Sequence, residues 1–183
     1  GHKTALWVME RDDPAETIKK EKPDIAAFSC ITGSHYYYLR VAYELKKRFP
    51  HLLVTFGGPH FTFFPAEILR NNWIDFLCVG EGIKAWPELL SAIERGSKTN
   101  GIRNIVTREN ASFVLEEQRN KLVQISAPEG EANIGDSLAL DHLSCRQAHL
   151  RPREANLDDL PFMDRGLVYN NTEFRHRYKR TMI

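Results

Sequence analysis

The chain has 183 residues, a length that accommodates one domain with a hydrophobic core and leaves room for an appended arm. Hydrophobic residues make up 42% and charged residues 27%, and the formal net charge of +1 gives no electrostatic reason to expect a nucleic acid or an anionic membrane as a partner. No stretch approaches the roughly 20 apolar residues that span a bilayer, and no signal peptide is recognisable, so we expect a cytoplasmic protein.

The first hundred residues alternate between short apolar runs, typical of buried strands, and amphipathic stretches, typical of helices. In chain order, these patterns predict a strand over 4–9, a helix over 14–20, a strand over 24–29, a helix from Ser34 to Phe49, a strand over 52–57, a helix over 64–71, a strand over 75–80, a helix over 83–95 and an edge strand over 103–108. Strands that alternate with helices of this length form right-handed βαβ units around a parallel sheet. We therefore predict an α/β fold with a doubly wound, Rossmann-like parallel sheet of about five strands.

After Arg108 the pattern changes, and three parts of the chain are expected. Residues 1–108 form the α/β domain. Residues 109–160 form a connector, with a possible hairpin over 112–126 and a region rich in Pro, Gly, Glu, Asn and Asp after it. Residues 161–183 lead into a further domain and end in a basic tail, which we interpret as a solvated or partner-facing arm.

The three cysteines, Cys30, Cys78 and Cys145, are widely and irregularly spaced. An odd number with such spacing argues against a disulfide framework, and no two lie close enough to form a metal-binding pair. Cys30 and Cys78 lie in apolar runs, so we expect both to be small core residues. No metal ligand and no catalytic residue is predicted within this chain.

Candidate ligand-binding residues follow three of the predicted strands. The segments are SCITGSH (29–35), GGPH (57–60) and GEG (80–82). In an open parallel sheet, ligands bind beyond the carboxyl ends of the strands. These segments offer hydroxyls, glycines and helix N-termini, but no carboxylate cluster and no G-x-S-x-G turn, so they suit a large cofactor better than hydrolysis or phosphoryl transfer. The alternative reading is that the glycines only form turns.

Two further features leave alternatives open. Gly80 to Ala85 fits the G-x-G-x-x-G/A pattern of dinucleotide-binding loops, although this motif normally opens the first βαβ unit. His35 and His60 lie on ligand-side loops, where each could contact a cofactor or coordinate a metal. No second His or Cys stands beside His60 in the sequence, which favours a polar loop contact.

Three segments in combination carry a family resemblance: PDIAAFSCITGSHYYYLRVAYELKKRFPHLLVTFGGPHFTFFPAEIL, DFLCVGEG and DDLPFMDR. Together they resemble the N-terminal half of B12-dependent radical SAM proteins, in the branch that includes the anaerobic magnesium-protoporphyrin monomethyl ester cyclase and related methyltransferases. The similarity covers residues 1–108, is lost over 109–154 and returns at 157–165. It implies a flavodoxin-like domain that buries the nucleotide tail of cobalamin.

The resemblance, combined with the loops above, predicts these cofactor-binding residues: Ser29, Ile31, Thr32, Gly57, Gly58, Pro59, His60, Gly80, Glu81 and Gly82. Ile31 replaces the leucine of the family's Ser-x-Leu segment. The hydroxyls of Ser29 and Thr32 would donate to cobalamin, and Gly57 and Gly58 would allow close approach of the backbone. We expect a bulky residue at either glycine to abolish binding and to leave the fold intact.

Departures from the family pattern shape the functional expectation. The sequence has no Asp-x-His-x-x-Gly segment, which implies cobalamin bound without a protein histidine ligand. It also has no Cys-x-x-x-Cys-x-x-Cys signature for a 4Fe-4S cluster, so the chain alone is not expected to cleave S-adenosylmethionine. It opens near the family's second strand, and the first strand and helix are expected to be missing.

The sequence thus predicts a cobalamin-binding module of a radical SAM enzyme for methyl transfer or radical oxidative cyclisation. Its partners would be a C-terminal radical SAM domain of the same polypeptide and the small-molecule substrate of the parent oxidoreductase or methyltransferase. Two alternatives remain: a nicotinamide-dinucleotide-binding oxidoreductase domain, and a degenerate interaction domain without a ligand.

Overall fold

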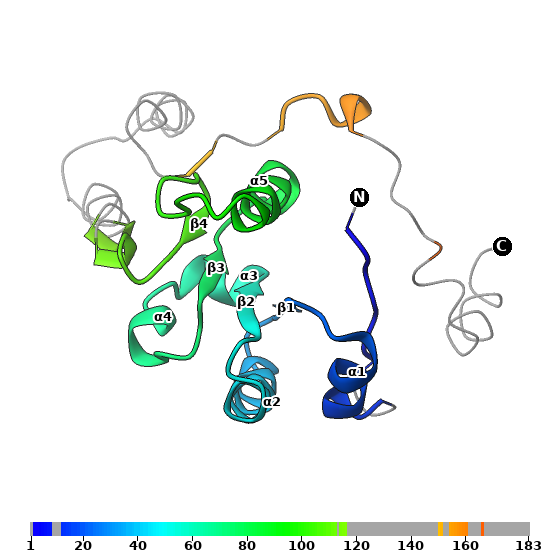
Figure 1. Ribbon diagram of the computed structural model, residues 1–183. Coiled ribbons are helices and arrows are strands. Elements are labelled where there is room, and N and C mark those ends of the chain that lie inside the picture. The colour runs from blue at the N-terminus through cyan, green and yellow to red at the C-terminus, as the bar shows by residue number, and fades with distance from the viewer. Residues whose placement is uncertain are drawn as a thin grey trace, which may run out of the picture. The chain divides into compact units, whose positions relative to one another are not determined.

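A computed structural model describes residues 2–8, 12–112, 114–116, 150–151, 154–160 and 166 (Figure 1). The chain divides into two compact units, one over Asp24–Arg153 and the other over Gly1–Pro23 together with Glu154–Ile183. The first unit contains the sheet and all of the candidate site. Among the described residues, no helix is long and apolar enough to cross a membrane.

The sheet has the strand order β1-β2-β3-β4, formed by β1 (Ile25–Ser29), β2 (Leu53–Gly57), β3 (Phe76–Cys78) and β4 (Ile105–Val106). Strands β1, β2 and β3 are parallel, with Ser29 paired to Gly57 and Phe56 to Leu77. The short edge strand β4 is antiparallel to β3. The predicted α/β fold with an open, mostly parallel sheet is confirmed.

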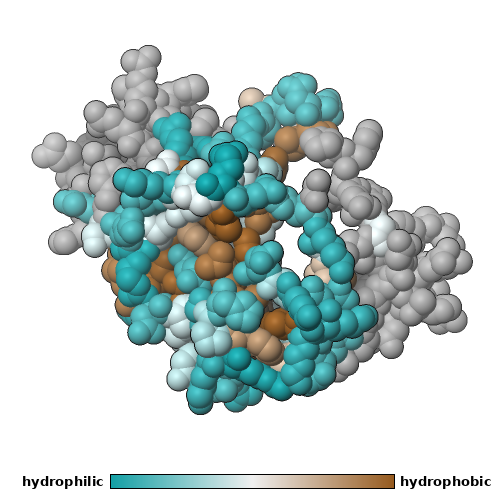
Figure 2. All heavy atoms as spheres, in the orientation of Figure 1, coloured by the Kyte–Doolittle hydropathy of each residue, from teal (hydrophilic) through white to brown (hydrophobic). Residues whose placement is uncertain are grey.

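Helices cover both faces of this sheet. Figure 1 shows α2 (His35–Arg48) and α4 (Glu67–Arg70) on one side of the strands and α5 (Gly82–Glu94) on the other, with the short α3 (Pro59–Phe63) beside β2. Because side chains alternate along a strand, β3 serves both faces: Phe76 and Cys78 pack with Ala85 and Leu89 of α5, and Leu77 points to the opposite face. The hydrophobic atoms gather in the centre of Figure 2, surrounded by mainly hydrophilic side chains.

Three predicted elements differ from the structure. Residues 4–8 form no strand, although the sequence predicts one over 4–9. A strand forms only where it pairs with a neighbouring strand, and the described sheet consists of β1 to β4 without this segment. The helix predicted over 64–71 is replaced by α3 and α4, because Pro65 lies between them and cannot extend a helix. Residues 111–112 and 114–116 are helical where a hairpin was possible; the rest of that segment, Cys145 and the basic tail lie outside the described residues.

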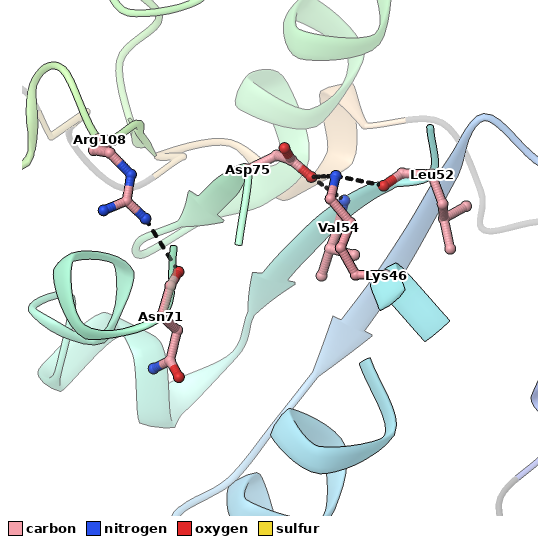
Figure 3. Close-up of polar contacts among 6 residues, drawn as sticks. All are labelled: Lys46, Leu52, Val54, Asn71, Asp75 and Arg108. Atoms are coloured by element: carbon pink, nitrogen blue, oxygen red, sulfur yellow. Dashed lines mark hydrogen bonds and ion pairs between the residues drawn. The ribbon is translucent and has the colours of Figure 1, made fainter. Parts of the chain in front are cut away.

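A polar network closes the edge at which β2 and β3 begin (Figure 3). Lys46 of α2 donates to the Leu52 carbonyl at 2.7 Å and to Asp75 Oδ2 at 2.8 Å. The same oxygen of Asp75 accepts from the Val54 amide at 2.7 Å. Arg108 donates to the carbonyls of Ile68 and Asn71 nearby. These contacts stabilise the starts of β2 and β3. The candidate site lies at the opposite edge of the sheet, where the parallel strands end.

The unit that contains the N-terminal residues includes the helix α1 (Pro14–Glu21). Asp13 caps it by accepting from the Ala15 amide at 2.8 Å, and Pro14 occupies the first helical position, as the sequence predicts. Lys3 forms a salt bridge with Glu21 at 2.8 Å. The same unit contains a 3-10 turn, η1 (Leu157–Asp159).

Candidate functional site

Three loops meet where the parallel strands β1, β2 and β3 end. They follow Ser29, Gly57 and Cys78, and each leads toward a helix: α2, α3 and α5. Because the strands are parallel and adjacent, their carboxyl ends lie along one edge of the sheet. The ten residues predicted from the sequence all lie in these loops or at their borders, and we call this region the loop edge.

Backbone contacts join the first two loops directly. The Cys30 amide donates to the Gly57 carbonyl at 3.0 Å, and the His60 amide donates to the Cys30 carbonyl at 3.1 Å. Thr62 joins the second loop to the third: its hydroxyl donates to the Gly58 carbonyl at 3.1 Å and accepts from the Gly80 amide at 3.0 Å. Thr62 was not predicted from the sequence, because a single threonine in a short helix carries no recognisable pattern.

Gly57 and Gly58 have different structural roles. Gly58 has φ +88° and ψ −179°, a conformation that only glycine adopts readily. A Cβ there would lie 2.8 Å from both the N and O atoms of Cys30 and 2.9 Å from Ser29 Oγ. A Cβ on Gly57 would meet Cys78 at 3.5 Å, an ordinary contact. The expectation that either glycine can be replaced without harming the fold is therefore wrong for Gly58, which the first loop's backbone requires to be a glycine.

The third loop depends on Asn104, which sequence reasoning missed. Its buried side chain donates to the Val79 carbonyl at 2.8 Å and lies 3.4 Å from the Glu81 carbonyl, and its Oδ1 accepts from the Arg151 amide at 2.6 Å. Asn104 has φ +70°, which asparagine tolerates better than most residues. The sequence places Asn104 inside the predicted edge strand over 103–108, where asparagine is uncommon, and this was the available signal.

The loop of Gly80 to Gly82 does not form a dinucleotide-binding unit. Such a unit requires two parallel strands joined by a helix, whereas β4, which follows α5, is antiparallel to β3. The glycines have local functions: Gly80 has φ +74°, and a Cβ on Gly82 would lie 3.2 Å from Cys78 Sγ. Gly82 therefore lets α5 begin close to β3.

His35 and His60 form a stacked pair beneath the first two loops. Their ring centroids are 3.6 Å apart with an interplanar angle of 18°, and the residues are 6% and 4% exposed. His60 Nδ1 lies 3.2 Å from the Thr32 hydroxyl, and His35 Nδ1 accepts from the Gly33 amide at 3.1 Å. Burial, and secondarily the neighbouring His35, lower the pKa of His60, while Glu67 opposes that shift. His60 is thus a polar loop contact, and no group of three potential metal ligands occurs in the described part of the chain.

The loop edge presents hydroxyls, backbone and apolar side chains to solvent. Ser29, Thr32 and Gly80 are exposed, and Ile31 is 62% exposed. Large exposed apolar side chains follow the same loops: Tyr36 at 74%, Phe63 at 75%, Phe64 at 50% and Ile83 at 46%. A surface that mixes hydroxyl groups with exposed apolar side chains fits a large amphiphilic cofactor such as cobalamin.

The two cysteines of the sheet region are buried thiols, as predicted. Burial raises the pKa of Cys30 to about 12 and also raises the pKa of Cys78. Both therefore remain protonated at neutral pH and behave as core residues.

Comparison with known proteins agrees with this geometry. Residues 4–90 match the B12 binding domain family. The chain is 34% identical over 113 residues to an uncharacterised methyltransferase of Pyrococcus horikoshii, an alignment that covers 61% of this chain and 24% of that protein. It is 37% identical over 71 residues to the cobalamin-dependent radical SAM methyltransferase TokK of Streptomyces tokunonensis, covering 38% of this chain and 10% of that protein. It is also 32% identical over 89 residues to the anaerobic magnesium-protoporphyrin IX monomethyl ester cyclase of Rubrivivax gelatinosus, covering 48% of this chain and 16% of that protein.

The chain spans less than a quarter of the length of each of these relatives. The family match includes β1, β2 and β3 and all three loops of the loop edge. The open α/β sheet, the glycine-bearing loops at one edge and the match lead to the same assignment, and the resemblance drawn from the sequence is confirmed. Residues 4–90 of this chain are a domain of the B12-binding family.

Proposed function

We propose that this chain is the cobalamin-binding module of a longer cobalamin-dependent radical SAM protein, and that it holds cobalamin at the loop edge. The observation that carries the proposal is the convergence of three glycine-bearing loops, with exposed hydroxyl and apolar side chains, at one edge of a domain of the B12-binding family. The relatives whose names mention cobalamin and radical SAM chemistry support the wider assignment. Residues 1–108 would form the binding domain, 109–160 the connector and 161–183 the lead-in to the next domain.

Different residues of the loop edge would make different kinds of contact with cobalamin. Ser29 and Thr32 would donate hydrogen bonds from exposed hydroxyls, and Ile31 would pack against the apolar part of the ligand. Gly57 would present backbone without a side chain. Gly80, Glu81 and Gly82 would contribute the loop that leads into α5.

The proposed roles of Gly58, Pro59 and His60 are to set the shape of the second loop. Gly58 supplies a backbone conformation that other residues resist, and Pro59 starts α3 with a pre-set φ angle. His60 anchors the loop to the Cys30 carbonyl through its amide at 3.1 Å.

Bound cobalamin would supply cobalt-based methyl-transfer or redox chemistry to the parent protein. That protein would add a 4Fe-4S cluster and S-adenosylmethionine in a C-terminal domain of the same polypeptide, and would act on a small molecule by methyl transfer or radical oxidative cyclisation. This chain contributes binding and orientation, and none of its described residues has a catalytic role in the proposal.

A matched pair of exposed apolar positions tests the location of the site. Ile31→Asp introduces a charge at the loop edge, and Leu69→Asp introduces the same charge on α4, where the leucine is 42% exposed. Burying the Ile31→Asp carboxylate against a corrin should weaken hydroxocobalamin binding by at least tenfold, or about 1.4 kcal/mol. Leu69→Asp should bind as the unsubstituted chain does. Equal affinity of the two variants in equilibrium dialysis would remove the loop edge as the binding site.

A further inference from the structure

The stacked imidazoles of His35 and His60 have an unusual set of partners for buried histidines. No carboxylate hydrogen-bonds to either ring among the described residues. His35 Nδ1 accepts from the Gly33 amide at 3.1 Å, and only an unprotonated ring nitrogen can accept. His60 Nε2 is buried and has no hydrogen-bond partner among the described residues. The hydrogen bond from Gly33 therefore requires a neutral His35, and burial of the unpartnered Nε2 disfavours a positive charge on His60.

The surroundings of the pair favour the neutral form. Aromatic rings neighbour both histidines: the Tyr36 ring centroid lies 3.9 Å from that of His35 with the planes tilted by 38°, and the Phe64 centroid lies 5.0 Å from that of His60. Among the described residues, the carboxylate that favours a positive charge on His60 is that of Glu67 of α4, which is already paired with Arg70 at 3.0 Å. A second positive charge 3.6 Å away across the stack would be strongly unfavourable, because like charges at that distance repel in a partly buried site.

The pair acts on the residues that the proposed cofactor would touch. His35 holds Gly33 through its Nδ1, and His60 holds Thr32 through its Nδ1 at 3.2 Å. Gly33 has φ +105°, one of many conformations open to a glycine, so contacts with the surroundings are needed to select it. A Cβ on Gly33 would meet no atom within 4 Å, so packing around the glycine does not supply that support. The two imidazoles fasten this loop together with the Ser34 hydroxyl, which donates to the Ile31 carbonyl at 3.2 Å.

We propose that His35 is a positioning residue: its neutral imidazole, stacked on His60, holds residues 31–33 in the conformation that presents Ile31 and Thr32 at the loop edge, and protonation of the pair releases this loop. The functional part of this inference rests on the proposed function, because it predicts that cobalamin is lost when the loop is released. The structural part concerns the chain alone and can be measured without cobalamin.

The first measurement follows the Gly33 amide by nuclear magnetic resonance in the full chain, titrated from about pH 8 to about pH 5, the range in which histidine changes charge. The Gly33 amide shift should follow a protonation step, because the hydrogen bond to His35 Nδ1 breaks when that atom gains a proton. In His35→Asn the side-chain oxygen can still accept from the Gly33 amide but cannot be protonated. The amide shift should then be nearly independent of pH. His51→Asn, which removes an exposed histidine from the loop after α2, is the control. Its Gly33 amide shift should depend on pH as it does in the unsubstituted chain.

The second measurement is the affinity for hydroxocobalamin by equilibrium dialysis at the same pH values. One pH unit below the protonation step that the Gly33 amide reports, about a tenth of the molecules keep the loop in place, so the apparent affinity should fall about tenfold. In His35→Asn the fall should be clearly smaller. His35→Leu, which has no acceptor for the Gly33 amide, should bind more weakly than His35→Asn at neutral pH.

The two measurements separate the two claims. A Gly33 amide that does not respond to pH, or that responds equally in His35→Asn, would overturn the positioning role even if cobalamin binds. The pH response of the Gly33 amide is measured in the unsubstituted chain, so it decides the positioning role even if a variant fails to fold. Absence of hydroxocobalamin binding at every pH would overturn the proposed function, while the amide titration would still decide the role of His35.

Discussion

Gly58→Ala and Gly57→Ala should differ sharply in stability, although the two glycines are adjacent and belong to the same loop. A non-glycine residue at φ +88°, ψ −179° costs on the order of 1–3 kcal/mol in backbone strain. The new Cβ would also lie 2.8 Å from two backbone atoms of Cys30, and overpacking of this kind costs a further ~1–3 kcal/mol. Gly58→Ala should therefore lower the free energy of unfolding by about 2–6 kcal/mol. Gly57→Ala makes only a 3.5 Å contact with Cys78 and should change it by less than about 1 kcal/mol.

Urea unfolding followed by tryptophan fluorescence measures the difference. Trp73 packs against Phe56 in the core, so its emission reports loss of tertiary structure. With a denaturant slope of about 2 kcal/mol per molar, typical for a small domain, the midpoint of Gly58→Ala should fall by about 1–3 M relative to that of Gly57→Ala. Equal midpoints for the two variants would refute the argument that the first loop's backbone requires a glycine at position 58.

Three further predictions follow from the same contacts. Asp75→Asn removes the charge that binds Lys46 and the Val54 amide, and should lower the free energy of unfolding by about 1–3 kcal/mol in urea; an unchanged midpoint would contradict a structural role for this network. Because burial raises the pKa of Cys30 to about 12, iodoacetamide at about pH 8 should leave Cys30 and Cys78 unmodified in the folded chain and modify both in urea, which peptide mass spectrometry resolves; rapid native labelling would disagree. Because the pKa of His60 is lowered on folding, the unfolded chain takes up a proton that the folded chain does not, and stability should fall as the pH drops below about 6.5; a flat profile of urea midpoints between about pH 7.5 and 5.5 would count against this.

Strands that form distinct apolar runs in the sequence could be predicted from the sequence. The runs at 24–29, 52–57 and 75–80 are mostly apolar because helices cover both faces of the sheet, and each contains an observed strand. The apolar run at 4–9 has the same local character, but a strand also needs a neighbour with which to pair. The described sheet consists of β1 to β4, and residues 4–8 are not one of its strands. Pairing is a property of the whole sheet, so the apolar run alone could not show whether residues 4–9 form a strand.

The position of the candidate site could be predicted from the sequence, but the contacts among its residues could not. That three loops share one edge follows from parallel strand order, and this could be inferred from alternating elements. The stack of His35 on His60 joins the start of α2 to α3, and it depends on the register of Ser29 with Gly57 and on the path of the loop that precedes each helix. The different roles of Gly57 and Gly58 likewise depend on φ angles and on the nearness of Cys30, which no spacing rule encodes.

The central claim is that this chain binds cobalamin at the loop edge, and the most direct test is a visible-absorption titration with hydroxocobalamin followed by desalting. We expect the chain to retain close to one equivalent of the corrin, with a shifted absorption spectrum, and Ile31→Asp to retain much less than Leu69→Asp. Passage of all the corrin through the desalting column free of protein would contradict the claim and would favour a B12-type fold that serves only as an interaction domain.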